Sequence, residues 1–288
     1  MIVDDVASVR GGIVRRARRP PGWRAPGPPP HVPADRGELW PGRDEDLCHL
    51  AGDWRILQNV HGHRWSLDDL VTAWCAAEAV GAAPRRLVDL GCGIGSVLLL
   101  LAWRFPDARC VGIEAQASSV ALARRSAAWN GAAGRCDVRR GDLRDLAAVA
   151  EAAGVDLVTG TPPYLPPGSA TRSSMPQRGA CRIEDRGGIE DYCAAAARLL
   201  APGAPFVVCA AAGQHARVAA AAASAGLAPG TRLDVVPRDG KEPLFAVHVM
   251  TRGATRSPHV LAPLVVRHAD GRRTEAFRSL RVAMGMPP

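Results

Sequence analysis

The chain lacks the sequence features of membrane, secreted and zinc-binding proteins. It contains no apolar run of about 18 residues, the length that a membrane-spanning helix needs. Its first residues include no apolar segment of the kind that directs secretion. The eight cysteines form no Cys-x-x-Cys pair, whereas zinc sites normally show closely spaced ligand pairs. We therefore expect buried, reduced thiols in a cytoplasmic protein that spans no membrane and holds no metal.

Lysine is almost absent, although the chain is basic. Lys241 is the only lysine, so arginine supplies nearly all of the positive charge behind the formal net charge of +8. A basic surface favours polyanionic partners such as RNA. The abundance of Ala, Gly, Pro and Arg is also typical of a GC-rich genome, so codon usage contributes to the arginine excess. The charge favours a nucleic-acid partner without establishing one.

Composition divides the chain into two parts. Residues 1–46 are rich in Pro and Arg and lack apolar periodicity, which predicts a flexible tail or an extended arm. Such an arm either touches RNA phosphates through its arginines or is simply disordered. Residues 47–288 are expected to form one domain. Its parts are an N-terminal segment with a helix (47–84), an α/β core (85–252) and a C-terminal extension (253–288).

Short apolar strands alternate with helices from Arg85 onward. Strands are expected at 87–90, 110–113, 136–139, 155–158, 206–209, 232–236 and 244–250. Helices are expected at 97–103, 118–129, 143–153, 189–200 and 215–225, after a first helix capped by Ser66 and Asp69. This alternation predicts an α/β fold with a seven-stranded, mostly parallel sheet and helices on both faces. A short loop containing Asp239 and Gly240 joins the last two strands, so the last strand should be antiparallel.

The first motif that carries chemistry is the glycine loop Asp89-Leu90-Gly91-Cys92-Gly93-Ile94-Gly95, between the first core strand and a helix. Glycines permit unusual dihedral angles and a close approach of the backbone to a ligand. Glu114, at the end of the second core strand, is placed to accept two hydrogen bonds from ribose hydroxyls. A glycine loop with such an acid is found in nicotinamide sites as well as in S-adenosylmethionine sites.

Two details favour S-adenosyl-L-methionine as the cofactor. The loop reads G-x-G-x-G after Asp89, whereas the dinucleotide fingerprint is G-x-G-x-x-G. Asp142 follows the third core strand, where it either contacts an adenine amino group or caps a helix. The expected cofactor residues are the acids, the glycines and their neighbours: Asp89, Gly91, Cys92, Gly93, Gly95, Glu114, Ala115, Asp142 and Leu143.

The second motif, Thr161-Pro162-Pro163-Tyr164, directly follows the fourth core strand, where such a sheet presents groups beside its cofactor. The prolines lack N–H donors, which leaves the carbonyls of Thr161 and Pro162 free to face a substrate. Acceptors that bind both N–H groups of a conjugated amine free its lone pair for attack on a methyl carbon. The ring of Tyr164 is placed to stack on a flipped base. We expect these four residues to be catalytic, with Thr161 also contacting the cofactor; elsewhere in a chain such a motif would be an ordinary loop.

These motifs resemble the class I methyltransferases with an N-P-P-Y signature, which methylate adenine N6, cytosine N4, guanine N2 or a glutamine amide. The chain is most similar to the bacterial tRNA adenine-N6 methyltransferases that act on the anticodon loop of a valine tRNA. Three further stretches carry this likeness, which covers roughly residues 47–280: Gln58–Asp69, Pro163–Gly168 and Leu264–Glu275. The resemblance implies a Rossmann-like fold, S-adenosylmethionine, tRNA or other RNA as the partner, and Arg64 and Asp68 at the mouth of the cofactor site.

Two features depart from that family. The family has Asn where this chain has Thr161, whose shorter hydroxyl accepts through a single oxygen. Residues 168–188 resemble an insertion, which either grips phosphates or covers the substrate, or is an exposed loop. Its arginines are Arg172, Arg178, Arg182 and Arg186. His61 and His63 have no third ligand nearby in sequence, so we expect no metal site there.

Three functions are therefore compatible with the sequence. The first is methylation of an adenine amine in tRNA or other RNA, favoured by the charge and by the arginine-rich segment. The second is methylation of a protein glutamine amide or of a small molecule, favoured by Thr161 and by the lack of a recognisable RNA-binding module. The third is an inactive protein that binds S-adenosylmethionine and has lost activity through Thr161.

Overall fold

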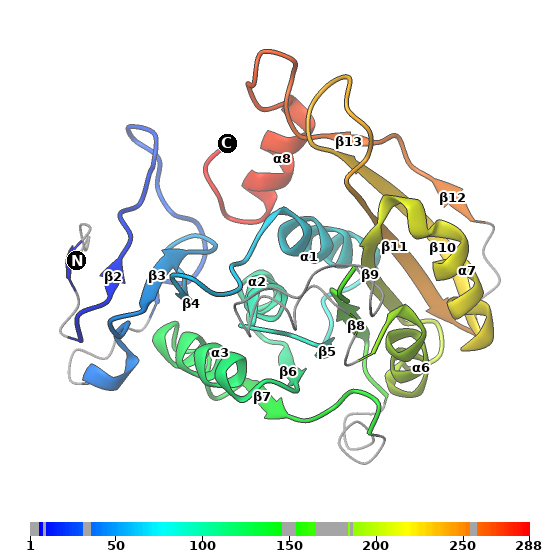
Figure 1. The fold of residues 1–288 in the computed structure, drawn as a ribbon, viewed down its shortest axis with the longest axis horizontal. Coiled ribbons are helices and arrows are strands. Elements are labelled where there is room, and N and C mark those ends of the chain that lie inside the picture. The colour runs from blue at the N-terminus through cyan, green and yellow to red at the C-terminus, as the bar shows by residue number, and fades with distance from the viewer. Residues whose placement is uncertain are drawn as a thin grey trace.

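The computed structural model describes residues 6–7, 10–30, 36–145, 154–164, 184, 187–253 and 258–288. A central twisted sheet has helices on both sides, and a smaller sheet lies at the N-terminal end of the molecule (Figure 1). Within the described residues, no helix is both long enough and apolar enough to cross a bilayer.

Seven strands form the body of the main sheet. In chain order they are β5 (Arg86–Leu90), β6 (Arg109–Glu114), β7 (Cys136–Arg140), β8 (Leu157–Gly160), β9 (Pro205–Ala211), β10 (Leu227–Val236) and β11 (Phe245–Arg252). Across the sheet their order is β10-β11-β9-β8-β5-β6-β7. Strands β5 to β9 are parallel, whereas β11 is antiparallel to β9 and to β10. The expected fold class and the antiparallel last strand are confirmed.

The sheet differs from the expected seven strands at its outer edge. Two short strands, β12 (His259–Val260) and β13 (Leu264–Val265), pair in parallel with β10 and raise the number to nine. Each contains only two residues, which is too short for the alternation of apolar and polar side chains to be visible in the sequence.

The helices form one layer on each face of the sheet. One layer contains α1 (Leu67–Ala79), α2 (Ser96–Arg104) and α3 (Ala117–Trp129), and the other contains α6 (Ile189–Leu199) and α7 (His215–Ser224) (Figure 1). Side chains along β9 alternate between the two cores, with Val207 and Cys209 in the first and Phe206 and Val208 in the second. Most of the helix expected at 143–153 lies outside the described residues.

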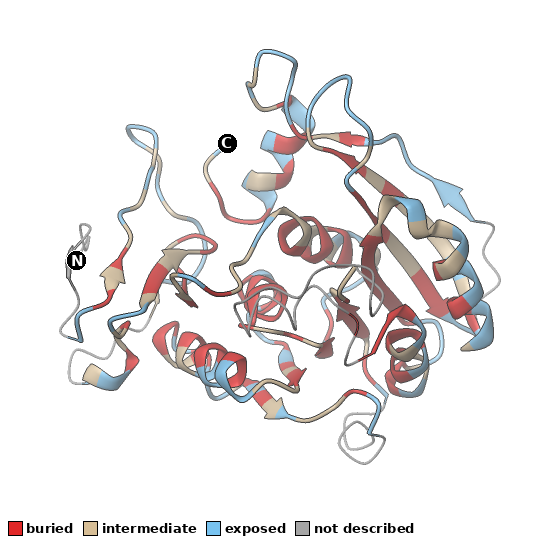
Figure 2. Cartoon of the chain, in the orientation of Figure 1, coloured by how far each residue is buried: buried red, intermediate tan, exposed pale blue. Residues whose placement is uncertain are grey.

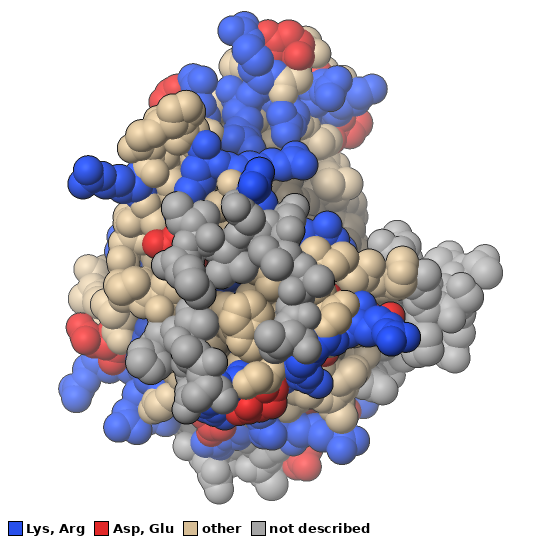
Figure 3. All heavy atoms as spheres, turned by 90° about the vertical axis from the view of Figure 1, so that its left-hand side faces the viewer, with Lys and Arg blue, Asp and Glu red and all other residues tan. Residues whose placement is uncertain are grey.

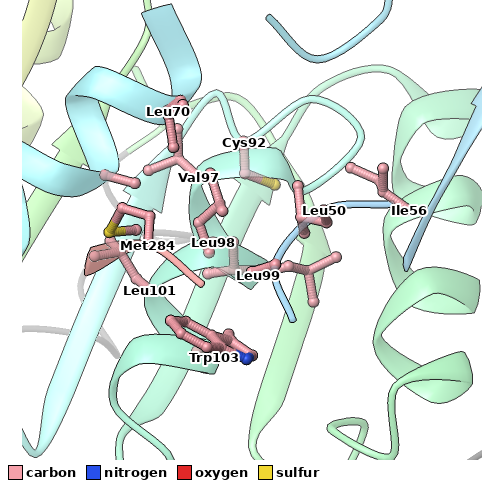
Figure 4. Close-up of a cluster of buried hydrophobic side chains, with 14 of the residues drawn as sticks. Leu50, Ile56, Leu70, Cys92, Val97, Leu98, Leu99, Leu101, Trp103 and Met284 are labelled. Atoms are coloured by element: carbon pink, nitrogen blue, oxygen red, sulfur yellow. The ribbon is translucent and has the colours of Figure 1, made fainter. Parts of the chain in front are cut away.

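Helix α2 is the centre of the larger core. Its residues from Val97 to Trp103 are all apolar and all buried, which is typical of a helix enclosed on every side (Figure 2). The side chains of Leu50, from the N-terminal region, and Met284, near the C-terminus, lie against this helix (Figure 4). The C-terminal helix α8 (Glu275–Ala283) precedes Met284. Leu50 of the N-terminal region and Met284 near the C-terminus therefore share one core with the main sheet.

Part of the segment expected to be a flexible tail belongs to a second sheet. That sheet contains β1 (Val6–Ala7), β2 (Ile13–Val14), β3 (Glu45–His49) and β4 (Arg55–Asn59), in this order, and a 3-10 helix, η1 (Gly37–Leu39), precedes β3. The expected boundary between residues 46 and 47 falls inside β3. The fully buried Asp46 accepts a hydrogen bond from Arg15 Nε, 2.9 Å away. The Pro-rich composition disfavours helices, but it permits extended strands that pair with later residues.

Three glycines from distant parts of the chain pack against Trp103. A Cβ atom at Gly27 would lie 2.5 Å from the indole Nε1, and one at Gly285 would lie 2.4 Å from Cη2. A Cβ at Gly52 would lie 3.0 Å from Nε1. The N–H of Gly52 also donates to the carbonyl of Gly285, 2.7 Å away. Only glycine permits such a close approach, so the N-terminal segment and the C-terminal residues are fixed at one point.

Candidate active site

A cavity of about 650 Å³ lies at the carboxyl ends of β5, β6, β7 and β8. This is the edge where open α/β sheets bind their ligands, and the volume is in the usual range for small-molecule sites. The walls come from the glycine loop after β5, the residues after β6 and β7, the Thr161–Tyr164 segment after β8, and residues 62–69 around the start of α1.

Most residues expected at the site line this cavity. They are Arg64, Asp68, Gly91, Cys92, Gly93, Glu114, Ala115, Asp142, Leu143, Thr161, Pro162, Pro163 and Tyr164. Asp89 and Gly95 do not belong to its lining. Gly95 has a φ of 87° and is the N-cap of α2, so it shapes the turn into that helix. Of the two histidines, only His63 reaches the cavity wall.

Asp89 lies beneath the glycine loop, which differs from the expected contact with the cofactor. Its side chain accepts a hydrogen bond from Thr159 Oγ1, 2.8 Å away, and thereby joins β5 to β8. Burial raises the pKa of Asp89 to about 7, and the hydrogen bond from Thr159 opposes that shift. The residue therefore supports the loop from below.

Glu114 ties the glycine loop to the end of β6. Its Oε2 accepts from the N–H of Gly93 at 3.0 Å, and its Oε1 accepts from the N–H of Gln116 at 2.6 Å. A carboxylate offers about four lone-pair positions, so both oxygens keep capacity for ribose hydroxyls. Because Glu114 also lines the cavity, its placement fits the expected role at a ribose.

Gly91 is required by a close neighbour as well as by its backbone conformation. Its φ is 59°, and a Cβ there would lie 2.0 Å from the hydroxyl oxygen of Tyr192 on α6. Gly93 has a φ of 54°, but a Cβ there would meet nothing within 4 Å. The loop thus packs against protein at Gly91 and leaves open space at Gly93, as a cradle for a ligand requires.

Asp142 lies at the cavity wall and forms a local turn after β7. It lines the cavity, and its Oδ1 also accepts from the backbone N–H of Arg144 at 2.9 Å, as in a local Asx turn. The guanidinium of Arg144 binds the same carboxylate, with Nη2 2.6 Å from Oδ2. Contact of Asp142 with an adenine amino group stays a prediction.

Tyr164 is held by three groups from other elements. Its hydroxyl donates to Asp68 Oδ2 at 3.0 Å and lies 3.1 Å from Cys209 Sγ. Its carbonyl accepts from Gln214 Nε2 at 3.1 Å. Burial, together with the nearby Cys209 and Asp68, raises the pKa of the Tyr164 hydroxyl well above its ordinary value, so it is a neutral donor. The ring is positioned at the cavity wall, and stacking on a base stays a prediction.

Arg64 connects the mouth of the cavity to the N-terminal sheet. Its Nη1 donates to Asp46 Oδ1 at 3.1 Å, and its Nη2 lies 3.0 Å from Asp46 Oδ2. Asp46 also binds Arg15, so one buried carboxylate joins two arginines. The N-terminal segment thereby affects the position of a residue at the cavity mouth.

Several lining residues were not expected from the sequence. Ser66, Asp69, Ser96, Gln116 and Tyr192 are among them. Asp69 accepts from the N–H of Ser66 at 2.9 Å, so the capping interaction also lies at the cavity, and burial followed by the charge of Asp68 raises the pKa of Asp69 to about 7. Tyr192 lies on the apolar face of a helix, a pattern that indicates only a core position.

Other expectations concern metals and the arginine-rich segment. Within the described ranges, no group of three or more His, Cys, Asp or Glu side chains gathers as a metal ion would need. Arg172, Arg178, Arg182 and Arg186 lie outside the described residues.

The chain is similar to known methyltransferases in part of its sequence and in its fold. A family model described as a methyltransferase domain matches residues 87–169, from β5 past Tyr164. A predicted O-methyltransferase from Agrobacterium tumefaciens has a similar structure, with a TM-score of 0.60 and 19% identity over 76% of this chain and 98% of that one. The fold is that of a class I, Rossmann-like methyltransferase.

Within that class, the chain is similar to two enzymes named tRNA1(Val) (adenine(37)-N6)-methyltransferase. The one from Porphyromonas gingivalis is 33% identical over 135 residues, which cover 46% of this chain and 52% of the relative. The one from Aeromonas hydrophila is 28% identical over 199 residues, which cover 68% of this chain and 80% of the relative. The chain thus spans about half the length of the first relative. The resemblance expected from the motifs is confirmed.

Proposed function

We propose that this chain transfers methyl groups from S-adenosylmethionine to the N6 amine of adenine in tRNA or another RNA. The observation that carries the proposal is that Thr161–Tyr164 line the same cavity as Gly93 and Glu114. A methyl donor and an amine held by these two groups of residues would meet in one space. The similarity to tRNA adenine-N6 methyltransferases and the formal net charge of +8 support RNA as the substrate.

The residues present fit the cofactor. Glu114 would hold the ribose hydroxyls, and the open side of Gly93 would admit the ligand against the loop backbone. Asp142 and Leu143 would contact the adenine, since they line the cavity after β7. The cofactor supplies an electrophilic methyl carbon on a sulfonium. The residues of this chain bind and orient it.

The amine would be activated by acceptors in the Thr161–Tyr164 segment. The hydroxyl oxygen of Thr161 and the carbonyl of Pro162 would accept its two N–H bonds and free the nitrogen lone pair for attack. The proton leaves the nitrogen after transfer, so no base is needed before the attack. Tyr164, fixed by Asp68 and Gln214, would present its ring to the base that carries the amine.

Thr161 favours a second candidate, a glutamine amide of a protein, which presents the same planar NH₂ group. Acceptors that activate an adenine amine would serve a primary amide equally well, and Thr161, which differs from the Asn of the resembled family, lines the cavity in which that group would lie.

We propose a cytoplasmic location. The cysteines of the described residues are all free thiols, which a reducing compartment maintains.

The test uses the full chain with methyl-labelled cofactor and three substrate pools: total tRNA, total protein and a metabolite extract. We expect label in tRNA, and, after nuclease digestion, in a methylated adenine nucleoside. Glu114→Ala, which removes the expected ribose ligand, is the matched inactive control. Label found only in protein or in small molecules would overturn the RNA assignment, and no transfer to any pool would support the inactive alternative.

A further inference from the structure

Two further hollows flank the mouth of the candidate active site. The larger, about 690 Å³, lies between Arg15–Arg19 of the N-terminal segment and Gly285–Pro287 near the C-terminus. The smaller, about 410 Å³, lies between the start of α1 and helix α8. We call the two hollows together the arginine groove.

The groove and the active-site cavity share a wall. Arg64 lines both the cavity and the larger hollow, and Ser66 lines both the cavity and the smaller hollow. Trp65, between them in sequence, lines both hollows, as does Arg281 of α8. A ligand that occupied the groove would therefore lie directly beside the entrance to the cavity.

Arginine dominates the walls of the groove. The arginines are Arg15, Arg16, Arg18, Arg19 and Arg64 in the larger hollow, Arg267 and Arg273 in the smaller one, and Arg281 in both. None of the described lining residues is an aspartate or a glutamate. Lys and Arg side chains are also spread over the face that carries the N-terminal sheet, with Asp and Glu side chains among them (Figure 3). This lining favours an anionic ligand.

Two arginines in the C-terminal part of the groove bind backbone oxygens and no acidic side chain. Arg267 and Arg281 donate to the backbone oxygens of Gly271 and Pro287, 2.6 and 2.9 Å away. Among the ion pairs of the described residues, neither arginine binds an Asp or Glu side chain. Burial, and then the charges of Arg273 and Arg267, lower the pKa of Arg281 to about 10. A bound anion would relieve this repulsion.

The N-terminal wall is fastened to the domain before any ligand binds. Arg19 forms an ion pair with Asp53 and donates to the carbonyl of Gly52 at 3.2 Å. Arg55 donates from Nη1 to the carbonyl of Arg15 at 2.9 Å. A groove whose walls are already held in place loses little conformational entropy on binding.

Two half-buried tryptophans lie among the arginines of the larger hollow. The guanidinium of Arg19 lies 5.0 Å above the ring centre of Trp23, and Trp65 lies at the wall shared with the cavity. Arginines interleaved with exposed aromatic rings are typical of surfaces that bind RNA, because the guanidinium groups bind phosphates and the rings stack on unpaired bases. An acidic peptide would use the arginines but not the rings.

We propose that the arginine groove binds the phosphate backbone of the RNA whose target base enters the cavity beside Arg64. This rests on the proposed function for the identity of the RNA and adds the surface that holds it. The groove combines residues 15–19, which lie outside the family resemblance, with the C-terminal helix, so this chain would hold its RNA partly through its own N-terminal segment.

The test compares two double variants that change the charge equally. Arg18→Glu with Arg267→Glu alters two exposed arginines of the groove. Arg109→Glu with Arg198→Glu alters two exposed arginines that line neither hollow, at the start of β6 and in the last turn of α6, and serves as the control. Affinity for fluorescent total tRNA is measured by anisotropy at several salt concentrations, and cofactor affinity by calorimetry.

We expect the groove variant to bind tRNA about tenfold more weakly at low salt, with a salt slope reduced by about 1 for each lost phosphate contact. The control variant should match the wild type, and all three proteins should bind the cofactor equally. Unchanged tRNA affinity and slope in the groove variant would overturn the groove, as would a wild type without salt-dependent tRNA binding. The proposal would also be overturned if the groove variant lost affinity for polyglutamate, an acidic peptide, but kept its affinity for tRNA. The labelling experiment tests the proposed function separately, because it measures transfer of the methyl group rather than affinity for tRNA.

Discussion

Tyr164, in the segment after β8, donates its hydroxyl hydrogen to the carboxylate of Asp68, 3.0 Å away in the first turn of α1. This bond joins the expected catalytic segment to the helix that closes the other side of the cavity. The position of the Tyr164 ring therefore depends on a helix nearly a hundred residues earlier in the sequence.

Removing that hydroxyl tests whether the bond positions the ring. Tyr164→Phe should lower kcat about fivefold and leave cofactor affinity unchanged, since a net hydrogen bond contributes about 1 kcal/mol. Asp68→Asn keeps an oxygen acceptor and should be milder, whereas Tyr164→Ala should abolish turnover. Steady-state kinetics with RNA and calorimetry with the cofactor provide the measurements. Full activity of both Tyr164 variants would show that the ring has no part in transfer.

The contact between Gly91 and Tyr192 predicts a specific rescue. Gly91→Ala places a methyl group where the Tyr192 hydroxyl lies and forces an alanine into a left-handed conformation, so it should destabilise the fold by about 3 kcal/mol. Adding Tyr192→Phe removes the oxygen that collides and should recover part of that loss. Thermal unfolding of the single and double variants measures the loss of stability and its recovery. Equal melting temperatures for the two would contradict the contact.

Gly93 should respond differently from Gly91, although both have a positive φ. Because a Cβ at Gly93 meets nothing, Gly93→Ala should lower stability only by the backbone strain, about 1–2 kcal/mol. Its methyl group would enter the space for the ligand, so cofactor affinity should fall at least tenfold. Calorimetry on the folded variant checks this, and unchanged affinity would place the cofactor elsewhere.

Asp89 predicts a pH-dependent difference in stability. An acid whose pKa rises on folding, here from 3.8 to about 7, stabilises the fold fully below its ordinary pKa and loses that contribution as the pH rises towards 7. Asp89→Asn keeps an acceptor for Thr159 but does not ionise. Relative to the wild type, its free energy of unfolding should gain on the order of 4 kcal/mol between pH 4 and pH 8, at about 1.4 kcal/mol for each unit of the pKa difference. Urea unfolding at both pH values measures the difference, and a constant difference would show that Asp89 is not buried as an acid.

Asp46 should hold both the N-terminal segment and Arg64 at the cavity mouth in position. Asp46→Ala removes the acceptor shared by Arg15 and Arg64, so we expect a loss of about 1–3 kcal/mol. Tryptic cleavage after Arg15, Arg16 and Arg18 should become faster. Glu38→Ala breaks an exposed ion pair with Arg36 and serves as the control, with cleavage at the wild-type rate. Wild-type protease resistance of the Asp46 variant would show that the segment is held by other contacts.

Thr161 can be tested by three substitutions. Thr161→Val keeps the shape but removes the hydroxyl, and should lower kcat about 100-fold if that oxygen binds the amine. Thr161→Ser should retain activity. Thr161→Asn introduces the acceptor typical of the resembled family and should retain or raise activity on RNA. A Val variant as active as the wild type would assign the activation of the amine to the backbone carbonyls alone.

Local patterns in the sequence predicted the core of the fold. The strands β5, β6 and β7 and the glycine loop are each encoded within a few residues, so periodicity and glycine spacing were sufficient. The N-terminal sheet was not predicted, because Ile13 pairs with Asp46 and no local pattern marks such a distant partner.

The site was predicted from position along the strands, which does not give the direction of each side chain. Glu114 ends its strand and lines the cavity, whereas Asp89 lies one residue before the end of β5, binds Thr159 and is not among the lining residues. Tyr192 was missed because a tyrosine among apolar helix residues has no signal that separates a cavity wall from an ordinary core.

Trp103 is enclosed by glycines from the N-terminal segment, from the β3–β4 turn and from the C-terminal residues. During synthesis, residues 15–19 would leave the ribosome long before residues 285–287, which form the opposite wall of the larger hollow. Domains begin to fold from the amino end while the chain is still growing. The sheet and the cofactor cavity can therefore form on the ribosome before the arginine groove exists, so the capacity to hold RNA would be acquired last.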